Sequence, residues 1–342
     1  MPRLDHLTEA QRQAIAGRVP RGLAAALDAG APLLRELVEA RALIRHAEPA
    51  MFMHRQVRAG RASVGLMACL DGAAFESGAA RPHRGFHSER VEVWRDRIER
   101  LETHADPLVI GFDATEEILD LFEREMNDRP LFHVVADDGA THTLWLGTRA
   151  DSLVRAFAGV REALLLEGHH RAAGAAAGRE AMALLVPLRD VTIRASVALM
   201  PADAVGPLAR MAEEPVQSDA MAPRAGHAWV CLPGAPDGGV VWKSLQVPAA
   251  FAAAVAEVES WAGGGRCRWQ PGLGIDRAAI EASMRAGDAG TAVLLADPSI
   301  EEVRALGAEG ALLPAGCTWC DPAFRSGLCM AEPCETATTM RE

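Results

Sequence analysis

A helical period of apolar residues runs through residues 7–46, and Pro20 and Gly30 divide this stretch into about three pieces. Thr8 with Gln11 has the spacing of a capping box, in which side chain and backbone satisfy each other at a helix start. The same signature occurs at Ser299 and Glu302. Further helices are predicted at residues 89–103, 113–125, 151–159, 172–177, 202–212, 248–261, 276–285 and 300–306.

Shorter apolar or alternating runs between these helices predict strands. They lie at residues 51–56, 62–69, 131–136, 141–146, 163–166, 182–188, 192–200 and 291–295, with two more within 227–246. Strands and helices alternate without a regular βαβ rhythm, which indicates an α/β fold in the broad sense (α+β), with a mixed sheet and surrounding helices.

Changes in composition suggest a domain division. Residues 1–48 are predicted to form a helical N-terminal segment, residues 49–213 a core domain, and residues 227–342 a C-terminal α/β subdomain. The stretch 214–226, rich in Pro, Ser, Asp and Gly, has the composition of a linker. Residues 72–86 are predicted to be a loop.

The chain has 342 residues and a formal net charge of −11. An acidic protein of this kind is not expected to bind nucleic acid through a broad basic face, although a local pocket can still hold a small anion. No apolar run reaches the roughly 18 residues of a membrane span. The N-terminus lacks the apolar core of a signal peptide, so we expect a cytoplasmic protein, of undetermined oligomeric state.

Four of the seven cysteines crowd near the C-terminus. The first two form a Cys-x2-Cys pair, but the second two are separated by four residues, which is an unusual spacing for zinc. Unpaired thiols in a tail are the favoured interpretation, and a zinc site is the alternative. The four residues are Cys317, Cys320, Cys329 and Cys334.

The most informative segment is Glu167-Gly168-His169-His170-Arg171, between an apolar run and an Ala-rich run. It predicts a buried strand, a glycine turn and a helix start, where unpaired N–H groups bind anions. Arg171 adds donors suited to phosphate, and the histidines add more. A polar turn with solvated histidines is the alternative.

This segment resembles the Asp-Gly-His-His-Arg-Tyr hallmark of a bacterial family, domain of unknown function 1015. Three further segments keep the order and spacing of family motifs, and the resemblance spans about residues 33–329. They are Phe52 to Gln56 with Gly65, His87 with Asp96-Arg97, and Thr318-Trp319 with Pro322 and Ser326-Gly327-Leu328. Two family lysines are replaced by Gly316 and Ala323, and a family Pro-Thr-His-Arg element appears as Pro201 to Ala204.

The loop is also similar to that of the ParB-like and sulfiredoxin-like fold, which includes free-serine kinases. The resemblance implies such a core with an extra C-terminal subdomain. It also implies phosphoryl transfer from ATP or ADP, with Mg²⁺, to a small hydroxylated metabolite such as serine. Gly168, His169, His170 and Arg171 would then hold phosphates.

Six other residues are candidates for the same site. Glu167 is the candidate base, or else an N-cap or partner of Arg171. His87 and Glu89 form a polar cluster before a helix, although Glu89 also suits the helix dipole. Arg55 is expected to be buried and therefore to contact a carboxylate or the ligand. Thr318 and Ser326 are candidate hydrogen-bonding groups, or ordinary turn residues. His133, His142 and the pair His83-Arg84 are expected at the surface.

These observations leave three functions open. The first is a small-molecule kinase that uses a nucleotide. The second is a non-catalytic nucleotide- or phosphometabolite-binding protein that has lost the accessory lysines. The third is a diverged enzyme acting on a phosphorylated or carboxylated metabolite.

Overall fold

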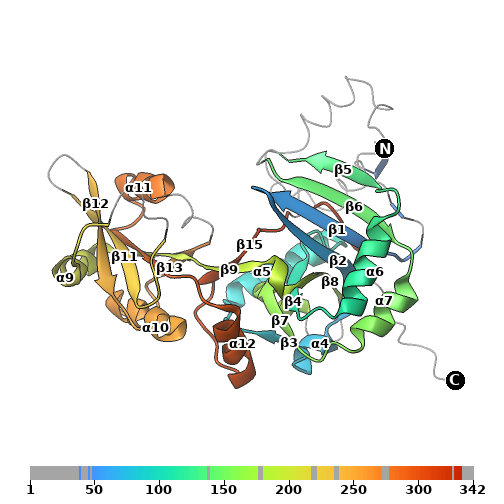
Figure 1. Cartoon of the computed structure of the whole chain (residues 1–342). Coiled ribbons are helices and arrows are strands. Elements are labelled where there is room, and N and C mark those ends of the chain that lie inside the picture. The colour runs from blue at the N-terminus through green and yellow to red at the C-terminus, as the bar shows by residue number, and fades with distance from the viewer. Residues whose placement is uncertain are drawn as a thin grey trace. The chain divides into compact units, whose positions relative to one another are not determined.

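The computed structural model describes residues 38–39, 45–46, 48–136, 139–175, 180–216, 222–234, 239–271, 277–325 and 327–332. By its internal contacts the chain forms two compact units (Figure 1). Unit 1 comprises Met1–Arg81, His87–Val191 and Pro322–Glu342, and unit 2 comprises Pro82–Phe86 and Thr192–Asp321. Residues 192–213 thus group with the C-terminal part, while the predicted division into folding domains stays a prediction.

Unit 1 is built on an eight-stranded mixed sheet in the order β3-β7-β4-β8-β2-β1-β6-β5. The pair β4 and β8 is parallel, and the pairs β4–β7, β8–β2, β2–β1, β1–β6 and β6–β5 are antiparallel. The α/β class with a mixed sheet is therefore confirmed. The strands are β1 (Met51–Arg58), β2 (Arg61–Asp71), β3 (Ala80–Pro82), β4 (Leu108–Phe112), β5 (Phe132–Val135), β6 (Thr141–Gly147), β7 (Ala163–Glu167) and β8 (Glu180–Pro187).

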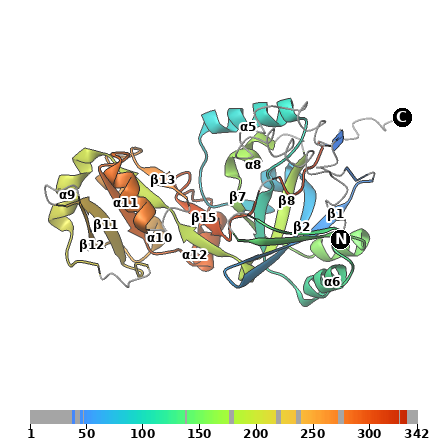
Figure 2. The same cartoon turned by 90° about the horizontal axis from the view of Figure 1, so that it is seen from above.

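Helices cover both faces of this sheet. Figure 2 shows α5 and α8 on one side of the strands and α6 on the other. All five residues of β4 are buried, which requires cover on both faces. The helices are α4 (Ala73–Glu76), α5 (Ser88–Leu101), α6 (Glu116–Met126), α7 (Ala150–Phe157) and α8 (His169–Ala175), and the 3₁₀ turn η2 spans Leu188–Asp190.

Unit 2 contains a five-stranded antiparallel sheet in the order β12-β11-β14-β10-β13, and a separate pair of strands, β15 and β9. The strands are β9 (Thr192–Ala195), β10 (Val197–Met200), β11 (His227–Pro233), β12 (Val240–Gln246), β13 (Arg268–Gln270), β14 (Thr291–Leu295) and β15 (Thr318–Asp321). The helical elements are η3 (Ala202–Ala204), α9 (Val205–Met211), α10 (Phe251–Trp261), α11 (Arg277–Arg285) and α12 (Ile300–Glu309).

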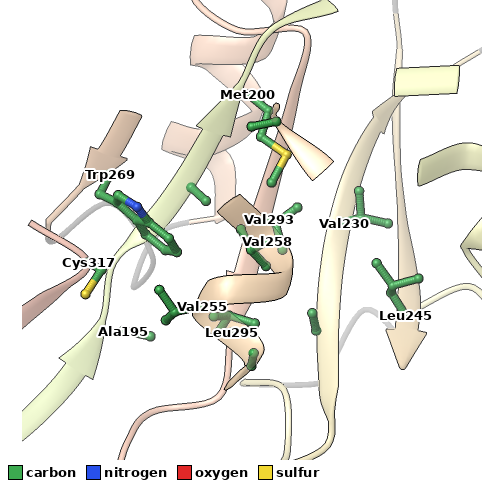
Figure 3. Close-up of a cluster of buried hydrophobic side chains, with 14 of the residues drawn as sticks. Ala195, Met200, Val230, Leu245, Val255, Val258, Trp269, Val293, Leu295 and Cys317 are labelled. Atoms are coloured by element: carbon green, nitrogen blue, oxygen red, sulfur yellow. The ribbon is translucent and has the colours of Figure 1, made fainter. Parts of the chain in front are cut away.

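Strand alternation gives the five-stranded sheet two apolar faces. On one face Val230 and Val293 pack with Val255 and Val258 of α10, and Trp269 and Cys317 belong to the same cluster (Figure 3). On the other face Trp229 and Leu294 pack with Ile280 and Met284 of α11. Because both faces are covered, the central strand β14 is fully buried.

The predicted elements agree with the structure where local signals are strong. Thr115 caps α6 by accepting from the Ile118 amide, and Ser299 with Glu302 forms the expected capping box on α12. The predicted strand 192–200 is wrong, because it is divided at Ser196 into β9 and β10, which belong to different sheets. The predicted loop 72–86 contains α4 and β3, and β13 and β15 were also missed. The predicted helices in residues 7–46 lie almost wholly outside the described residues.

Within the part of the chain that the structure describes, no helix is both long enough and apolar enough to cross a bilayer.

Candidate functional site

The Glu167–Arg171 loop has the predicted strand–turn–helix form, in which β7 ends at Glu167 and α8 begins at His169. Gly168 between them has a φ of +91°, which L side chains rarely adopt. A Cβ atom at this position would lie 2.6 Å from Leu108 Cδ2 and 2.9 Å from Arg171 Nη2. The loop therefore needs glycine both for its backbone angle and for the close approach of its neighbours.

His87 and His170 come together at the starts of two helices. Their ring centroids are 5.9 Å apart and the rings are inclined by 26°. His87 is the N-cap residue of α5, with extended backbone and no side-chain capping bond, and His170 lies in the first turn of α8. A Cβ atom on Gly174 would lie 3.7 Å from the Val91 carbonyl oxygen, so the two helices pack closely. Two imidazoles and two positive helix ends thus face one region, which favours an anion.

Arg171 is held by neighbouring groups instead of extending into solvent. Its Nη2 donates a hydrogen bond of 2.9 Å to the Pro107 carbonyl oxygen, and its guanidinium carbon lies 5.0 Å from the Trp94 ring centroid. Arg97 lies 4.8 Å from the same ring. Burial raises the pKa of the Asp106 carboxyl, while the positive charges of Arg171 and Arg97 act to lower this pKa. A hollow of about 20 Å³, which is room for a single water molecule, is lined by Trp94, Arg97, Asp106 and Arg171.

The other residues predicted around this loop have different exposures. Glu167 is half-buried at the end of β7, opposite Val109 of β4. His169 is buried, with 3 % of its surface exposed. Glu89 is exposed in the first turn of α5, where its charge suits the helix dipole. The structure brings His87, Glu167 to Arg171 and Glu89 to the same two helix starts, while their roles in binding stay predictions.

Arg55 is a correction to the sequence analysis, because it is exposed and not buried. It alternates along β1 with His54 and Gln56, which are buried on the opposite face of the sheet. An exposed guanidinium does not need a buried carboxylate, so the expected reason for a contact with Glu167 or a ligand no longer holds.

Thr318 belongs to unit 2, where it is fully buried on β15 and its Oγ1 lies 2.8 Å from His83 Nε2. The prediction that His83 and Arg84 lie at the surface is wrong, because only 0 % and 6 % of their surfaces are exposed. His133 is exposed as predicted. Ser326 lies outside the described residues.

A buried polar cluster on β1, β2 and β6 was missed. Gln56 lies opposite Ser63 of β2 and His142 of β6, and His54 follows on the same face. The His54 and His142 rings are stacked at 5.3 Å, with His54 Nε2 3.1 Å from His142 Nδ1. All four side chains are at most 2 % exposed, so His142 is not a surface residue as predicted. The sequence carried little signal for this cluster, because His54, Arg55 and Gln56 form an unbroken polar run and no alternation marks the buried face.

The described cysteines of the C-terminal group lie in ordered structure. Cys317 and Cys320 are buried in unit 2, and Cys329 is half-buried in unit 1, so they are not thiols of a tail. Burial raises the pKa of the Cys317 thiol to about 12, which favours the neutral form over the thiolate that binds zinc. Among the described residues, no group of three or more His, Cys, Asp or Glu is placed to hold a metal ion. Cys334 lies outside this set.

Comparisons with known proteins give a family and a set of similar structures. The model of the family described as protein of unknown function (DUF1015) matches residues 6–192, which is more than half of the chain. A search of curated proteins found no match.

Three solved structures illustrate the structural similarity. A free serine kinase in complex with AMP shares 15% identity at a TM-score of 0.40, over 74% of this chain and 86% of that one. A conserved hypothetical protein from Pyrococcus furiosus shares 14% identity at a TM-score of 0.40, over 74% of this chain and 90% of that one. SbnI with a C-terminal truncation, from Staphylococcus aureus, shares 12% identity at a TM-score of 0.41, over 75% of this chain and 82% of that one. At these identities and TM-scores the similarity assigns no role to any residue.

Proposed function

Since the chain belongs to the DUF1015 family of proteins of unknown function, we propose its activity from the geometry of its own residues: nucleotide-dependent phosphoryl transfer to a small hydroxylated metabolite, such as serine or a related amino acid. The observation that carries this proposal is the His87–His170 pair at the starts of α5 and α8. Two imidazoles beside two helix starts form a region suited to the charge of a nucleotide's phosphates.

Phosphoryl transfer depends mainly on positioning and on neutralising charge. In the proposed complex His87 and His170 donate hydrogen bonds to phosphate oxygens, and Arg171 contributes its positive charge from the next position on α8. Gly168 supplies the backbone angle of the turn between β7 and α8 and leaves room for the Arg171 guanidinium beside it. Either ATP or ADP fits this arrangement, because the proposed contacts are to phosphate oxygens, which both nucleotides have.

Glu167 is the proposed base. Its half-buried carboxylate ends the strand that leads into the loop. It would accept the proton of the acceptor hydroxyl while that oxygen bonds to the terminal phosphorus and the bond to the nucleotide breaks. Mg²⁺ is bound in proteins by phosphate oxygens and one or two carboxylates, so it would be shared between the nucleotide's phosphates and a carboxylate of the site. When bound, this ion would neutralise phosphate charge.

A second candidate is a nucleotide- or phosphometabolite-binding protein without catalysis. One observation favours it: the Arg171 guanidinium already contacts Pro107 and Trp94, so its donors are partly engaged within the protein. The replacement of two family lysines by Gly316 and Ala323 favours it as well.

The test is a transfer assay with Mg²⁺, ATP or ADP, and pooled hydroxylated amino acids, read by mass spectrometry. We expect one acceptor to gain a phosphoryl group, and His170→Ala to weaken nucleotide binding. Glu167→Gln should still bind nucleotide and lose about 100-fold or more in turnover. The exposed His133→Ala variant is the matched control.

The two candidates give different results in this assay. Nucleotide binding that depends on His170, without transfer to any acceptor, would support the binding protein. If neither nucleotide binds, the kinase and the nucleotide-binding protein are both ruled out, and a phosphometabolite-binding protein or a diverged enzyme is left.

A further inference from the structure

The side chain of Arg171 is turned back onto the protein from a short helix. A Cβ atom on Gly168 would lie 2.9 Å from Arg171 Nη2 and 3.2 Å from Nε, so the guanidinium lies directly over the glycine turn. The same Nη2 bonds to the carbonyl oxygen of Pro107, which is 64 residues earlier in the sequence. These contacts restrict the rotamers of a side chain that is otherwise among the most flexible.

Trp94 of α5 provides an aromatic surface for this guanidinium. The Arg171 guanidinium carbon is 5.0 Å from the indole centroid, within the range of a cation–π contact. Arg97, one turn further along α5, lies 4.8 Å from the same ring. Trp94 is half-buried, so the contact is partly shielded from water and is stronger than at an exposed site.

Asp106, in the segment before β4, lines the same small hollow as Trp94, Arg97 and Arg171. Its carboxylate is influenced by Arg171 from α8 and by Arg97 from α5, and both charges favour its ionised form against the cost of burial. Asp106 directly precedes Pro107, whose carbonyl accepts the Arg171 bond. One short segment therefore supplies both a charge and a hydrogen-bond acceptor to the Arg171 region.

We propose that Trp94 and Asp106 are positioning residues, which hold the Arg171 guanidinium in the orientation that meets a nucleotide phosphate. This inference rests on the proposed function. A donor that is already ordered loses less conformational entropy on binding than a mobile arginine, so affinity depends on the residues that order it. Neither Trp94 nor Asp106 touches the nucleotide in this proposal.

A double-mutant cycle on the full chain tests the proposal, with ADP affinity measured by calorimetry. We expect Asp106→Asn to weaken ADP binding about tenfold when Arg171 is present. In an Arg171→Ala background the same substitution should change affinity less than about twofold, because there is no guanidinium to position. Asp106→Glu should restore part of the affinity. The control is Asp96→Asn, which removes an exposed carboxylate of α5 that pairs with Arg100 at 3.0 Å.

The outcomes separate this inference from the proposed function. An Arg171→Ala variant with unchanged ADP affinity would remove Arg171 from phosphate binding, and this inference would fall with that part of the proposed function. Two other outcomes would contradict only the positioning role, provided that Arg171→Ala weakens ADP binding. In one, Asp106→Asn leaves ADP affinity unchanged; in the other, it lowers ADP affinity by the same factor with and without Arg171. Should Asp106→Asn fail to fold, Trp94→Leu takes its place in the same cycle, with the same expected coupling.

Discussion

Gln56 Nε2 donates a hydrogen bond of 3.1 Å to the carbonyl oxygen of Ala323, a residue 267 positions later in the chain. The Phe324 ring lies 6.4 Å from the His54 ring beside it. Residues 322–325 therefore lie against the buried polar cluster of β1, and the chain continues to Gly327, whose amide bonds to the Ala105 carbonyl. The C-terminal segment is thus fastened to unit 1 at separate points.

We expect Gln56→Ala to loosen this segment, because it removes the donor that holds the Ala323 carbonyl. Hydrogen–deuterium exchange should show faster exchange at the amides of Gly327 and Ala331, which bond to Ala105 and His104. The neighbouring Arg55→Ala variant is the control, since Arg55 is exposed on the other face of the sheet. Equal exchange in both variants would show that the Gln56 bond does not hold the segment.

Gly168→Ala is expected to destabilise the protein by about 2–4 kcal/mol, because it combines backbone strain at positive φ with a steric clash. Gly60 is the matched control. It also has positive φ, +77°, but nothing lies within 4 Å of a Cβ atom built there. Gly60→Ala should therefore cost only the backbone part, about 1 kcal/mol. Urea denaturation measures both variants, and equal losses would mean that the Leu108 and Arg171 contacts adjust at little cost.

His54 makes stability depend on pH. Burial, followed by the proximity of His142, lowers the pKa of His54 from 6.5 to about 4. Between these values the unfolded chain binds a proton that the folded protein does not, so stability is full above pH 6.5 and is lost as pH falls toward 4. The loss amounts to a few kcal/mol, on the order of 3.

His54→Gln should flatten this part of the pH profile, as measured by urea denaturation from pH 7 to pH 4. The exposed His133→Gln variant should leave the profile unchanged. Burial also lowers the pKa of His104, so a residual slope is expected in both variants. A His54→Gln profile as steep as that of the wild type would contradict the assignment.

Glu125, in the last turn of α6, is a fully buried carboxylate that bonds to the residues just before α7. It accepts hydrogen bonds from the Thr148 amide at 2.8 Å, the Thr148 hydroxyl at 3.1 Å and the Arg149 amide at 2.7 Å, and it pairs with the Arg149 guanidinium at 3.2 Å. Glu125→Gln should lower the free energy of unfolding by about 2–4 kcal/mol, because an amide replaces an acceptor-only group among donors. Glu123→Gln, exposed on the same helix, should change it by less than about 0.5 kcal/mol. Similar losses in both variants would count against this account.

The sequence determined the local elements, because their signals act between residues close in the chain. Thr115 and Ser299 mark helix starts through bonds to amides three residues away, and Gly168 marks a turn that only glycine makes easily. The short strands β3, β13 and β15 carry no such signal, since three or four residues form a strand only when a distant partner pairs with them.

The tertiary structure decided which residues meet. Segments far apart in the sequence meet where His87 stacks on His170 and where Arg171 contacts Pro107 and Trp94. Such packing of distant segments also buries His83 and His142. The sequence does not show whether a polar side chain faces water or a hydrogen-bonding partner inside the protein. Only the packing of distant elements decides between these two environments. For that reason the loop, and His87 through the family resemblance, could be predicted from the sequence, while Trp94, Asp106 and Pro107 around Arg171 could not.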